Sequence, residues 1–319
     1  MSDAKYRGNL ETVLVTGGAG FIGSHFVEEI CDDYNVIVID KLTYAGNEDN
    51  LKEVKGKIRF EKSDIANARV VIPLLDRVDY VVNFAAETHV DNSYDTPFEF
   101  FVTNVMAQQH LLESTRNYVG RLKKFVHIST DEVYGDRKDR TPADEESILE
   151  PNNPYAASKA AGDMLCRAYF KSFMVPIVIV RSSNNFGSRQ YPEKLIPRSI
   201  SLLKQNKKIQ LHGTGSYKRD WLYVRDNTSA IRLVMEKGNI GEIYNTYGNN
   251  IHSNIEIANR ILKIMNLNPE EYISYTPNRI SQDSEYHIMG DKIKRLGWTP
   301  NCNTDNFFEY LDKTIKSYI

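Results

Sequence analysis

The chain has 319 residues, of which 41% are hydrophobic and 26% charged, and its formal net charge is −2. This composition provides for a sizeable core, and the near-neutral balance gives no support for binding to nucleic acid or to a membrane. No stretch approaches the roughly 18 apolar residues of a membrane span. Three widely spaced cysteines favour neither a disulfide framework nor a metal site. We therefore expect a soluble, cytoplasmic protein without a bound metal.

Short apolar runs alternate with amphipathic stretches through the first half of the chain. The runs predict strands at residues 12–16, 36–40, 58–61, 79–85, 125–129 and 177–181. Such runs are typical of strands buried on both faces of a parallel sheet. Helical patterns at 21–31, 104–116 and 156–173 lie between them. The alternation predicts an α/β fold with a doubly wound parallel sheet.

The pattern changes after Phe186, where prolines and polar turns interrupt shorter elements. Residues 253–265 and 303–318 read as helices, and Ser253 with Glu256 three positions later forms a capping-box signature. We expect a dinucleotide-binding domain over residues 1–185, to which later segments return. A smaller substrate-binding lobe would occupy mainly residues 186–319 and share a cleft with that domain.

A glycine-rich turn follows the first predicted strand and opens the first predicted helix. Gly17, Gly20 and Gly23 let the backbone approach a pyrophosphate, and the helix then points its N–H groups at the anion. Asp40 ends the next strand about 20 residues later, where a carboxylate accepts hydrogen bonds from a ribose 2′-hydroxyl. This context predicts a Rossmann fold, and the carboxylate favours NAD over NADP because it repels a 2′-phosphate. Lys41 follows directly and would soften that repulsion.

Tyr155 and Lys159 form a YxxxK pair at the start of a predicted helix. Positions i and i+4 share one helix face, so we expect the ammonium to lower the pKa of the phenol. The phenol would then take a proton from a sugar hydroxyl as hydride leaves.

Two adjacent carboxylates, Asp131 and Glu132, follow Thr130 at the end of the strand FVHIS. The carboxyl ends of parallel strands line the ligand crevice, so we expect both acids to face the substrate. Elimination of water needs such a pair, namely a base for a carbon-bound proton and an acid for the leaving hydroxyl. Burial beside its neighbour would raise the pKa of one carboxyl and keep it protonated.

Several segments together resemble the nucleotide-sugar 4,6-dehydratases of the extended short-chain dehydrogenase/reductase family, above all those acting on dTDP-glucose. They read TGGAGFIGS, DKLTYAGN, NFAAETHVD, HISTDEVYGD, NPYAASKAAGD, RSSNNFG, YPEKLIP and RDWLYVRD. The resemblance runs from about Val13 to Gly248, and the related 4-epimerases lack the Asp-Glu pair. It implies C4 oxidation, loss of water across C5 and C6, and hydride return to C6.

The resemblance also implies a role for each matching residue. Tyr155 would be the base at the C4 hydroxyl with Lys159 as its partner, and Thr130 would hydrogen-bond the C4 oxygen. Asp131 would be the acid for the C6 oxygen, and Glu132 would take the C5 proton. The NAD site would comprise Gly17, Gly20, Phe21, Ile22, Gly23, Asp40, Lys41, Leu42, Thr43, Asp64, Ile65, Ala85, Ala86, Glu87, Tyr155, Lys159 and Asn185. The substrate site would comprise Thr88, Thr130, Asn184, Lys194, Leu195, Arg219, Asn254, Arg279 and Tyr286, with Arg219 at the diphosphate.

The chain departs from the family where the family reads close to DRPGHDRRY. Residues 278–286 read NRISQDSEY, so the register of Arg279, Asp283 and Tyr286 is kept while the Pro-Gly-His core and the paired arginines are lost. The base (dTDP or UDP) and the hexose (glucose or N-acetylglucosamine) therefore stay open. Added 5-epimerisation, a 4-epimerase and a non-catalytic NAD-binding protein are the alternatives. The resemblance further implies a homodimer packed through helices near residues 104–116 and 156–173.

Overall fold

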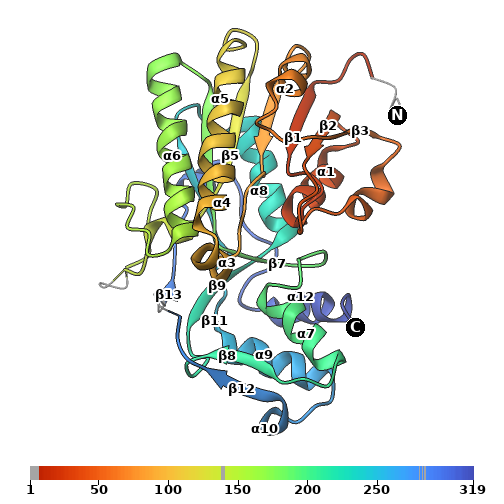
Figure 1. Ribbon diagram of the computed structural model, residues 1–319, viewed down its shortest axis with the longest axis vertical. Helices are drawn as coiled ribbons and strands as arrows, with labels where there is room; N and C mark the ends of the chain where they lie inside the picture. The colour runs from red at the N-terminus through yellow and green to blue at the C-terminus, as the bar shows by residue number, and fades with distance from the viewer. Residues whose placement is uncertain (1–6, 138–140, 280, 282, 284) are drawn as a thin grey trace.

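The computed structural model describes residues 7–137, 141–279, 281, 283 and 285–319. A seven-stranded parallel sheet runs through the larger part of the molecule in the order β10-β6-β5-β4-β1-β2-β3 (Figure 1). Its strands are β1 (Thr12–Thr16), β2 (Asn35–Asp40), β3 (Ile58–Lys62), β4 (Tyr80–Asn83), β5 (Lys124–Thr130), β6 (Ile177–Ser182) and β10 (Ile243–Thr246). The predicted α/β fold and its parallel sheet are confirmed.

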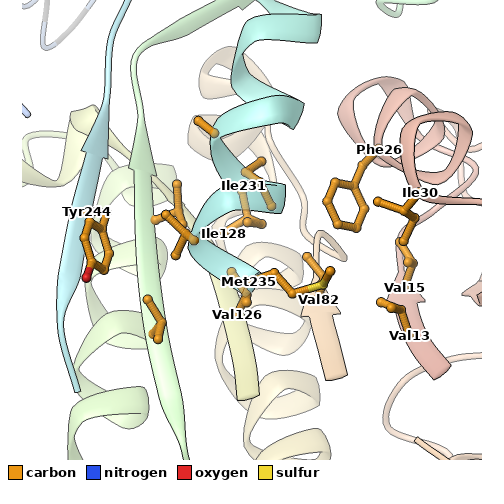
Figure 2. Close-up of a cluster of buried hydrophobic side chains, with 14 of the residues drawn as sticks. Val13, Val15, Phe26, Ile30, Val82, Val126, Ile128, Ile231, Met235 and Tyr244 are labelled. Carbon is orange, nitrogen blue, oxygen red and sulfur yellow. The ribbon is translucent and has the colours of Figure 1, made fainter. Parts of the chain in front are cut away.

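Helices cover both faces of this sheet. On one face, α1 (Phe21–Ile30) and α8 (Val224–Lys237) pack on the sheet, and Figure 2 shows their side chains meeting those of the strands. Phe26 and Ile30 of α1 and Ile231 and Met235 of α8 are fully buried there. The other face carries α2 (Ala68–Leu75), α5 (Gln108–Arg116) and α6 (Pro154–Phe173). Two apolar layers therefore hold the sheet between them.

The predicted helix at 104–116 differs from expectation at its start. Short helices α3 (Val90–Asp95) and α4 (Pro97–Phe101) lead into a π-helical stretch at Val102–Ala107, and α5 follows directly. The side chain of Asn104 in the wide turn bonds the backbone N–H and C=O of Glu87 and the Ser158 hydroxyl. A tertiary contact therefore accompanies the altered helical pitch.

A smaller lobe lies at the carboxyl edge of the sheet, toward the bottom of Figure 1. In it β9 (Lys218–Tyr223) pairs with β7 (Asn184–Phe186), β11 (Ile251–Ser253) and β13 (Glu285–Tyr286), while β8 (Ile209–His212) pairs with β12 (Ile273–Thr276). Its helices are α7 (Leu195–Lys204), α9 (Asn254–Ile264), α10 (Pro269–Tyr272) and α12 (Phe307–Lys316), and α11 (Asp291–Arg295) packs near β10. Helix α9 begins with the predicted capping box of Ser253 and Glu256.

The chain crosses between the two parts more than once. Helix α8 and strand β10 come after β8 and β9 in sequence, yet they pack on and extend the large sheet. Later segments thus return to the sheet, while the division at residue 185 stays a prediction. Among the described residues no helix is long and apolar enough to cross a membrane, and no acidic, histidine and cysteine side chains cluster as metal ligands would.

Candidate active site

A cavity of about 440 Å³ opens between the carboxyl edge of the sheet and the smaller lobe. Most of the residues expected to bind cofactor or substrate line it, including Asn184, Asn185, Leu195 and Asn254 from the lobe side. Strand ends and the first turns of helices supply the walls, as expected for an open parallel sheet. The sequence motifs, although far apart along the chain, are therefore brought together in one pocket.

The glycine turn is too tightly packed for side chains at two of its positions. Gly17 has a φ of +66°, and a Cβ on it would lie 2.7 Å from the Ala85 nitrogen. A Cβ on Gly23 would lie 2.3 Å from the Gly17 carbonyl oxygen. Helix α1 starts directly after the turn at Phe21. This cradle of bare backbone at a helix N-terminus fits a dinucleotide pyrophosphate.

Asp40 is held at the end of β2 by two backbone groups. Its carboxylate accepts hydrogen bonds from Ala19 N at 2.9 Å and from Leu42 N at 2.8 Å. Burial raises the pKa of Asp40 despite these bonds. Leu42, which was expected to touch the cofactor, lies off the cavity wall and contributes this backbone N–H instead. Each Asp40 oxygen keeps a lone pair, so the carboxylate is oriented for a ribose hydroxyl.

Lys41, next to Asp40 in the sequence, is paired with a different carboxylate. Its ammonium lies 2.9 Å from Asp64, and the hydrogen bond to that carboxylate raises the pKa of Lys41. Both residues line the cavity at the ends of adjacent strands. Because Asp64 offsets the lysine charge, the expected softening of the repulsion toward a 2′-phosphate is weak.

Tyr155 and Lys159 both reach the cavity from the first turns of α6, which Asn153 caps by accepting a hydrogen bond from Ala156 N. The expected effect on the phenol is wrong. The Lys159 ammonium donates to the Ile128 carbonyl at 2.6 Å, and burial lowers its pKa to about 8. Burial and the Glu132 charge raise the pKa of Tyr155, against a hydrogen bond with Thr130. The i, i+4 spacing places Tyr155 and Lys159 on one face of α6, but the Lys159 ammonium hydrogen-bonds the Ile128 carbonyl.

The two carboxylates diverge on a 3₁₀ turn at Asp131–Tyr134. Glu132 lines the large cavity and accepts a hydrogen bond from Asn153 Nδ2 at 3.2 Å. Asp131 differs from expectation, because it lies just behind that wall, 1% exposed, beside a separate cavity of about 20 Å³. Thr130 stands between it and the large cavity, and its hydroxyl donates to Asp131 Oδ1 at 3.1 Å.

The electrostatics of Asp131 match the protonated acid that elimination requires. Burial raises its pKa well above the ordinary value, and the charges of Glu132 and Asp220 raise it further. Its second oxygen, Oδ2, is buried without a hydrogen-bond partner among the described residues. A neutral carboxyl is the form that such surroundings favour.

Basic side chains approach the cavity from the lobe. Lys194 donates to the Thr88 carbonyl at 2.7 Å. Arg219 lies over the Tyr286 ring, 4.6 Å from its centroid, and burial lowers the pKa of this arginine. Arg279 makes a two-pronged ion pair with Asp91, at 2.5 and 3.0 Å. Arg219 donates to the Lys218 and Asp283 carbonyls at 2.6 and 3.3 Å. Each arginine therefore already uses two N–H groups, but the charge of Arg279 is the one paired with a carboxylate.

Sequence reasoning missed several residues of the cavity wall. Asn153 caps α6 and holds Glu132, and the Asn-Pro pair at a helix start was the signal available for it. Gln210 and His212 of β8 and Trp221 of β9 line the lobe side, but no motif marks them. Asp283 accepts a hydrogen bond from Asn152 Nδ2 at 2.8 Å and joins the divergent segment to the cavity. Residues 280, 282 and 284 of that segment lie outside the described residues.

The dinucleotide cradle with the adjoining Tyr155–Lys159 pair defines an extended short-chain dehydrogenase/reductase. Comparison with known proteins narrows the class, because the family described as GDP-mannose 4,6 dehydratase matches residues 14–311. The chain belongs to this family of nucleotide-sugar dehydratases, which confirms the resemblance seen in the sequence.

Relatives with known names agree with this assignment. The chain is 38% identical to human dTDP-D-glucose 4,6-dehydratase over 98% of its length and 91% of that protein. It is 39% identical to a trifunctional Arabidopsis thaliana protein that includes a UDP-glucose 4,6-dehydratase, but it spans only 47% of that protein. Among solved structures, a dTDP-glucose 4,6-dehydratase from Streptomyces venezuelae with NAD bound has a TM-score of 0.92. That structure is 39% identical, and the match covers 96% of both chains. A Thermotoga maritima UDP-glucose 4-epimerase is 28% identical at a TM-score of 0.87, over 96% of this chain and 98% of its own.

Proposed function

We propose that the chain catalyses the NAD-dependent 4,6-dehydration of a nucleotide-diphosphate hexose to a 4-keto-6-deoxy sugar nucleotide. The observation that carries the proposal is the position of Glu132 at the end of β5, lining the same cavity as Tyr155 and Lys159, with the buried Asp131 directly behind Thr130. The relatives named above with this activity support it. The nucleotide is dTDP or UDP, and the sugar is glucose or N-acetylglucosamine.

The glycine cradle, Asp40 and the Tyr155–Lys159 pair would hold NAD, with Thr43, Ile65 and Ala85–Glu87 along the same wall. When bound, NAD supplies a hydride acceptor for C4 and afterwards a hydride donor for C6. Asp40 would bind the adenosine ribose, and its charge would select against a 2′-phosphate. Lys159 would bind the other ribose and steady Tyr155.

Tyr155 would take the proton of the C4 hydroxyl during oxidation, with Thr130 bonded to the same oxygen. The resulting ketone makes the C5 proton acidic, because the carbanion left behind is stabilised by the adjacent carbonyl. Glu132, whose side chain reaches the cavity, would remove that proton. Asp131, whose pKa is raised by burial, would protonate the C6 hydroxyl so that it leaves as water.

A substrate panel tests the activity and identifies the nucleotide and sugar. The chain would be incubated separately with dTDP-glucose, UDP-glucose and UDP-N-acetylglucosamine, and the products weighed by mass spectrometry. We expect one of them to lose one water and, in deuterium oxide, to gain deuterium at C5, with no net NADH accumulating. A product that retains its 6-hydroxyl group would overturn the proposal.

The alternative function is that of a 4-epimerase, which the likeness to epimerase structures suggests. Variants of the two acids, Asp131 and Glu132, distinguish it from a dehydratase. An epimerase uses Tyr155 and Lys159 but needs neither carboxylate. Asp131→Asn with Glu132→Gln should therefore stop a dehydratase after C4 oxidation, whereas an epimerase would largely survive. Deuterium at C5 of a product with inverted configuration would instead indicate added 5-epimerisation.

We also propose a homodimer packed through α4, the π-helical stretch, α5 and α6. These helices stand side by side at one flank of the molecule in Figure 1. Phe98 is 74% exposed, and Met106 and Met164 are 54% and 43% exposed on the same group of helices. Sedimentation equilibrium should give twice the chain mass, and Phe98→Asp with Met106→Asp should shift it toward the monomer. A monomeric wild type would refute the dimer.

A further inference from the structure

Removal of the C5 proton requires a carboxylate that is aimed at one carbon atom. Glu132 lies in the first turn after β5, and its side chain reaches into the cavity that Tyr155 also lines. A glutamate side chain has several rotatable bonds, so its position in the chain does not by itself fix the direction of its carboxylate. The contact that holds this carboxylate therefore decides how well Glu132 works as a base at C5.

Asn153, at the start of α6, makes that contact. Its Nδ2 donates a hydrogen bond to Glu132 Oε2 at 3.2 Å. Its Oδ1 accepts a hydrogen bond from Ala156 N at 2.8 Å and thereby caps the helix. A backbone N–H can only donate, so the amide satisfies both contacts only with its NH₂ group turned toward Glu132.

The backbone around Asn153 keeps this amide in place. Asn153 is 6% exposed, and its carbonyl accepts a hydrogen bond from Ala157 N at 2.9 Å. Pro154 follows it and disfavours helical backbone at Asn153, which has the extended conformation of an N-cap, with φ −141° and ψ 161°. Because the cap already orders the amide, little further side-chain entropy is lost when it binds the carboxylate.

A neutral donor suits this position better than a basic one. Lys194 and Arg219 line the same cavity, and an ion pair with either would stabilise the Glu132 carboxylate and make it a weaker base. Lys194 donates to the Thr88 carbonyl at 2.7 Å, and Arg219 donates to two backbone carbonyls. The Asn153 amide orients the carboxylate without adding a positive charge to it.

The same helix start carries the phenol that acts at the neighbouring carbon. Tyr155 follows Asn153 by two residues, in the first turn of α6, and lines the cavity. In the proposed reaction Tyr155 acts at the C4 hydroxyl and Glu132 at C5. Asn153 therefore ties the base for C5 to the helix that carries the base for C4.

We propose that Asn153 is a positioning residue that aims the Glu132 carboxylate at C5 for the loss of water. Its own N–H bonds stay intact, while the C5 proton moves to Glu132 and returns to C5 when C6 is reduced. Oxidation of C4 does not use this carboxylate, so only the later steps depend on Asn153. The inference rests on the dehydratase activity proposed above.

Two variants separate this role from that of the helix cap. Asn153→Asp keeps the length and the capping oxygen but replaces the donor with a second acceptor, whereas Asn153→Ala removes both contacts. Aspartate caps helices about as well as asparagine, and alanine caps them poorly. A capping role alone would make Asn153→Ala the slower enzyme. The positioning role makes Asn153→Asp at least as slow in elimination, because it also places a like charge beside Glu132.

Stopped-flow absorbance of NADH in a single turnover follows both stages of the reaction. Enzyme with NAD bound would be mixed with whichever of dTDP-glucose, UDP-glucose and UDP-N-acetylglucosamine the wild type dehydrates. NADH forms as C4 is oxidised and disappears as hydride returns to C6, which requires prior loss of water. Asn153→Asp should form NADH within about twofold of the wild-type rate but consume it about tenfold or more slowly, the scale of a positioned acid–base group. Glu132→Gln sets the limit, with NADH formed and not consumed.

The possible failures can be told apart. Equal slowing of both stages in Asn153→Asp would mean that Asn153 acts through α6 as a whole, and no slowing of either would mean that Glu132 needs no tether. Each of these results overturns the proposal. If Asn153→Asp does not fold, the two stages are compared in Asn153→Ala, where equal slowing again refutes the positioning role. A wild type that dehydrates none of the three sugar nucleotides refutes the activity as well, whereas an active wild type with equally slowed variants refutes the positioning role alone.

Discussion

Replacing Asp163 with asparagine should destabilise the chain strongly, because it leaves a buried arginine without its anion. Asp163 lies on α6 one turn after Lys159, and its Oδ2 accepts a hydrogen bond from Arg181 Nε at 2.8 Å. The two side chains are 0% and 1% exposed. Burial alone would raise the pKa of Asp163, but the Arg181 charge, the His127 imidazole 3.5 Å away and the hydrogen bond from Arg181 hold it at about 2.

The size of the effect follows from this pair. A pKa of about 2 against an ordinary value of 3.8 corresponds to about 2–3 kcal/mol favouring the charged carboxyl. Removing the anion also leaves Arg181 unpaired, so the expected loss is about 3–5 kcal/mol. In the wild type this stabilisation is present above the unfolded pKa and disappears as the pH falls from 3.8 toward 2, since the folded pKa is the lower one.

Urea unfolding at pH 7 should show this loss as a lower midpoint concentration of urea. The slope of the free energy of unfolding against urea concentration should stay unchanged. Asp32→Asn is a matched control, because Asp32 pairs with Lys57 at 2.7 Å on the surface, with side chains 70% and 48% exposed. We expect no measurable shift in that variant. Equal midpoints for Asp163→Asn and Asp32→Asn would refute the argument that burial makes the Arg181 pair strong.

Three further outcomes are expected. Gly23→Ala should weaken NADH binding by roughly tenfold or more in a fluorescence titration, because its Cβ would lie 2.3 Å from a backbone oxygen, whereas Gly56→Ala, with nothing within 4 Å, should bind normally. Ser253→Ala should cost about 1 kcal/mol in urea unfolding through loss of the α9 cap, and an unchanged midpoint would contradict the cap's role. Burial lowers the pKa of both His25 and His127 to about 4, so thermal stability should fall as the pH drops from 6.5 to 4, by up to about 3 kcal/mol for each. A melting temperature that is constant over that range would contradict the argument that burial lowers the pKa of these two histidines.

The strands of the large sheet could be predicted because their signal is local. The apolar run at Thr12–Thr16 matches β1 at both ends, and the run at 177–181 falls one residue short of β6. Strand β10 was not predicted, since Ile243–Thr246 is only four residues long and its place in the sheet depends on pairing with distant β6. The π-helical stretch depends in the same way on the tertiary contacts of Asn104.

Motifs predicted which side chains gather at the site but not how they point. The spacing of Tyr155 and Lys159 places both on one face of α6, yet the acceptor of the lysine is a β5 carbonyl that no local pattern reveals. Adjacent carboxylates were expected to face one cavity, while the 3₁₀ turn sends Asp131 behind Thr130. Side-chain direction in a turn depends on backbone angles set by the whole fold, which explains these differences.

The late arrival of β10 has a consequence for synthesis on the ribosome. Strand β6 pairs with β5 on one side and β10 on the other, and some sixty residues separate β6 from β10 in the chain. Until Ile243–Thr246 emerges, the nascent sheet ends in a buried-type apolar strand with an unpaired backbone edge. Such an edge pairs readily with other chains, so ribosome-bound intermediates halted before residue 243 should recruit chaperones or aggregate, and those released after β10 should not.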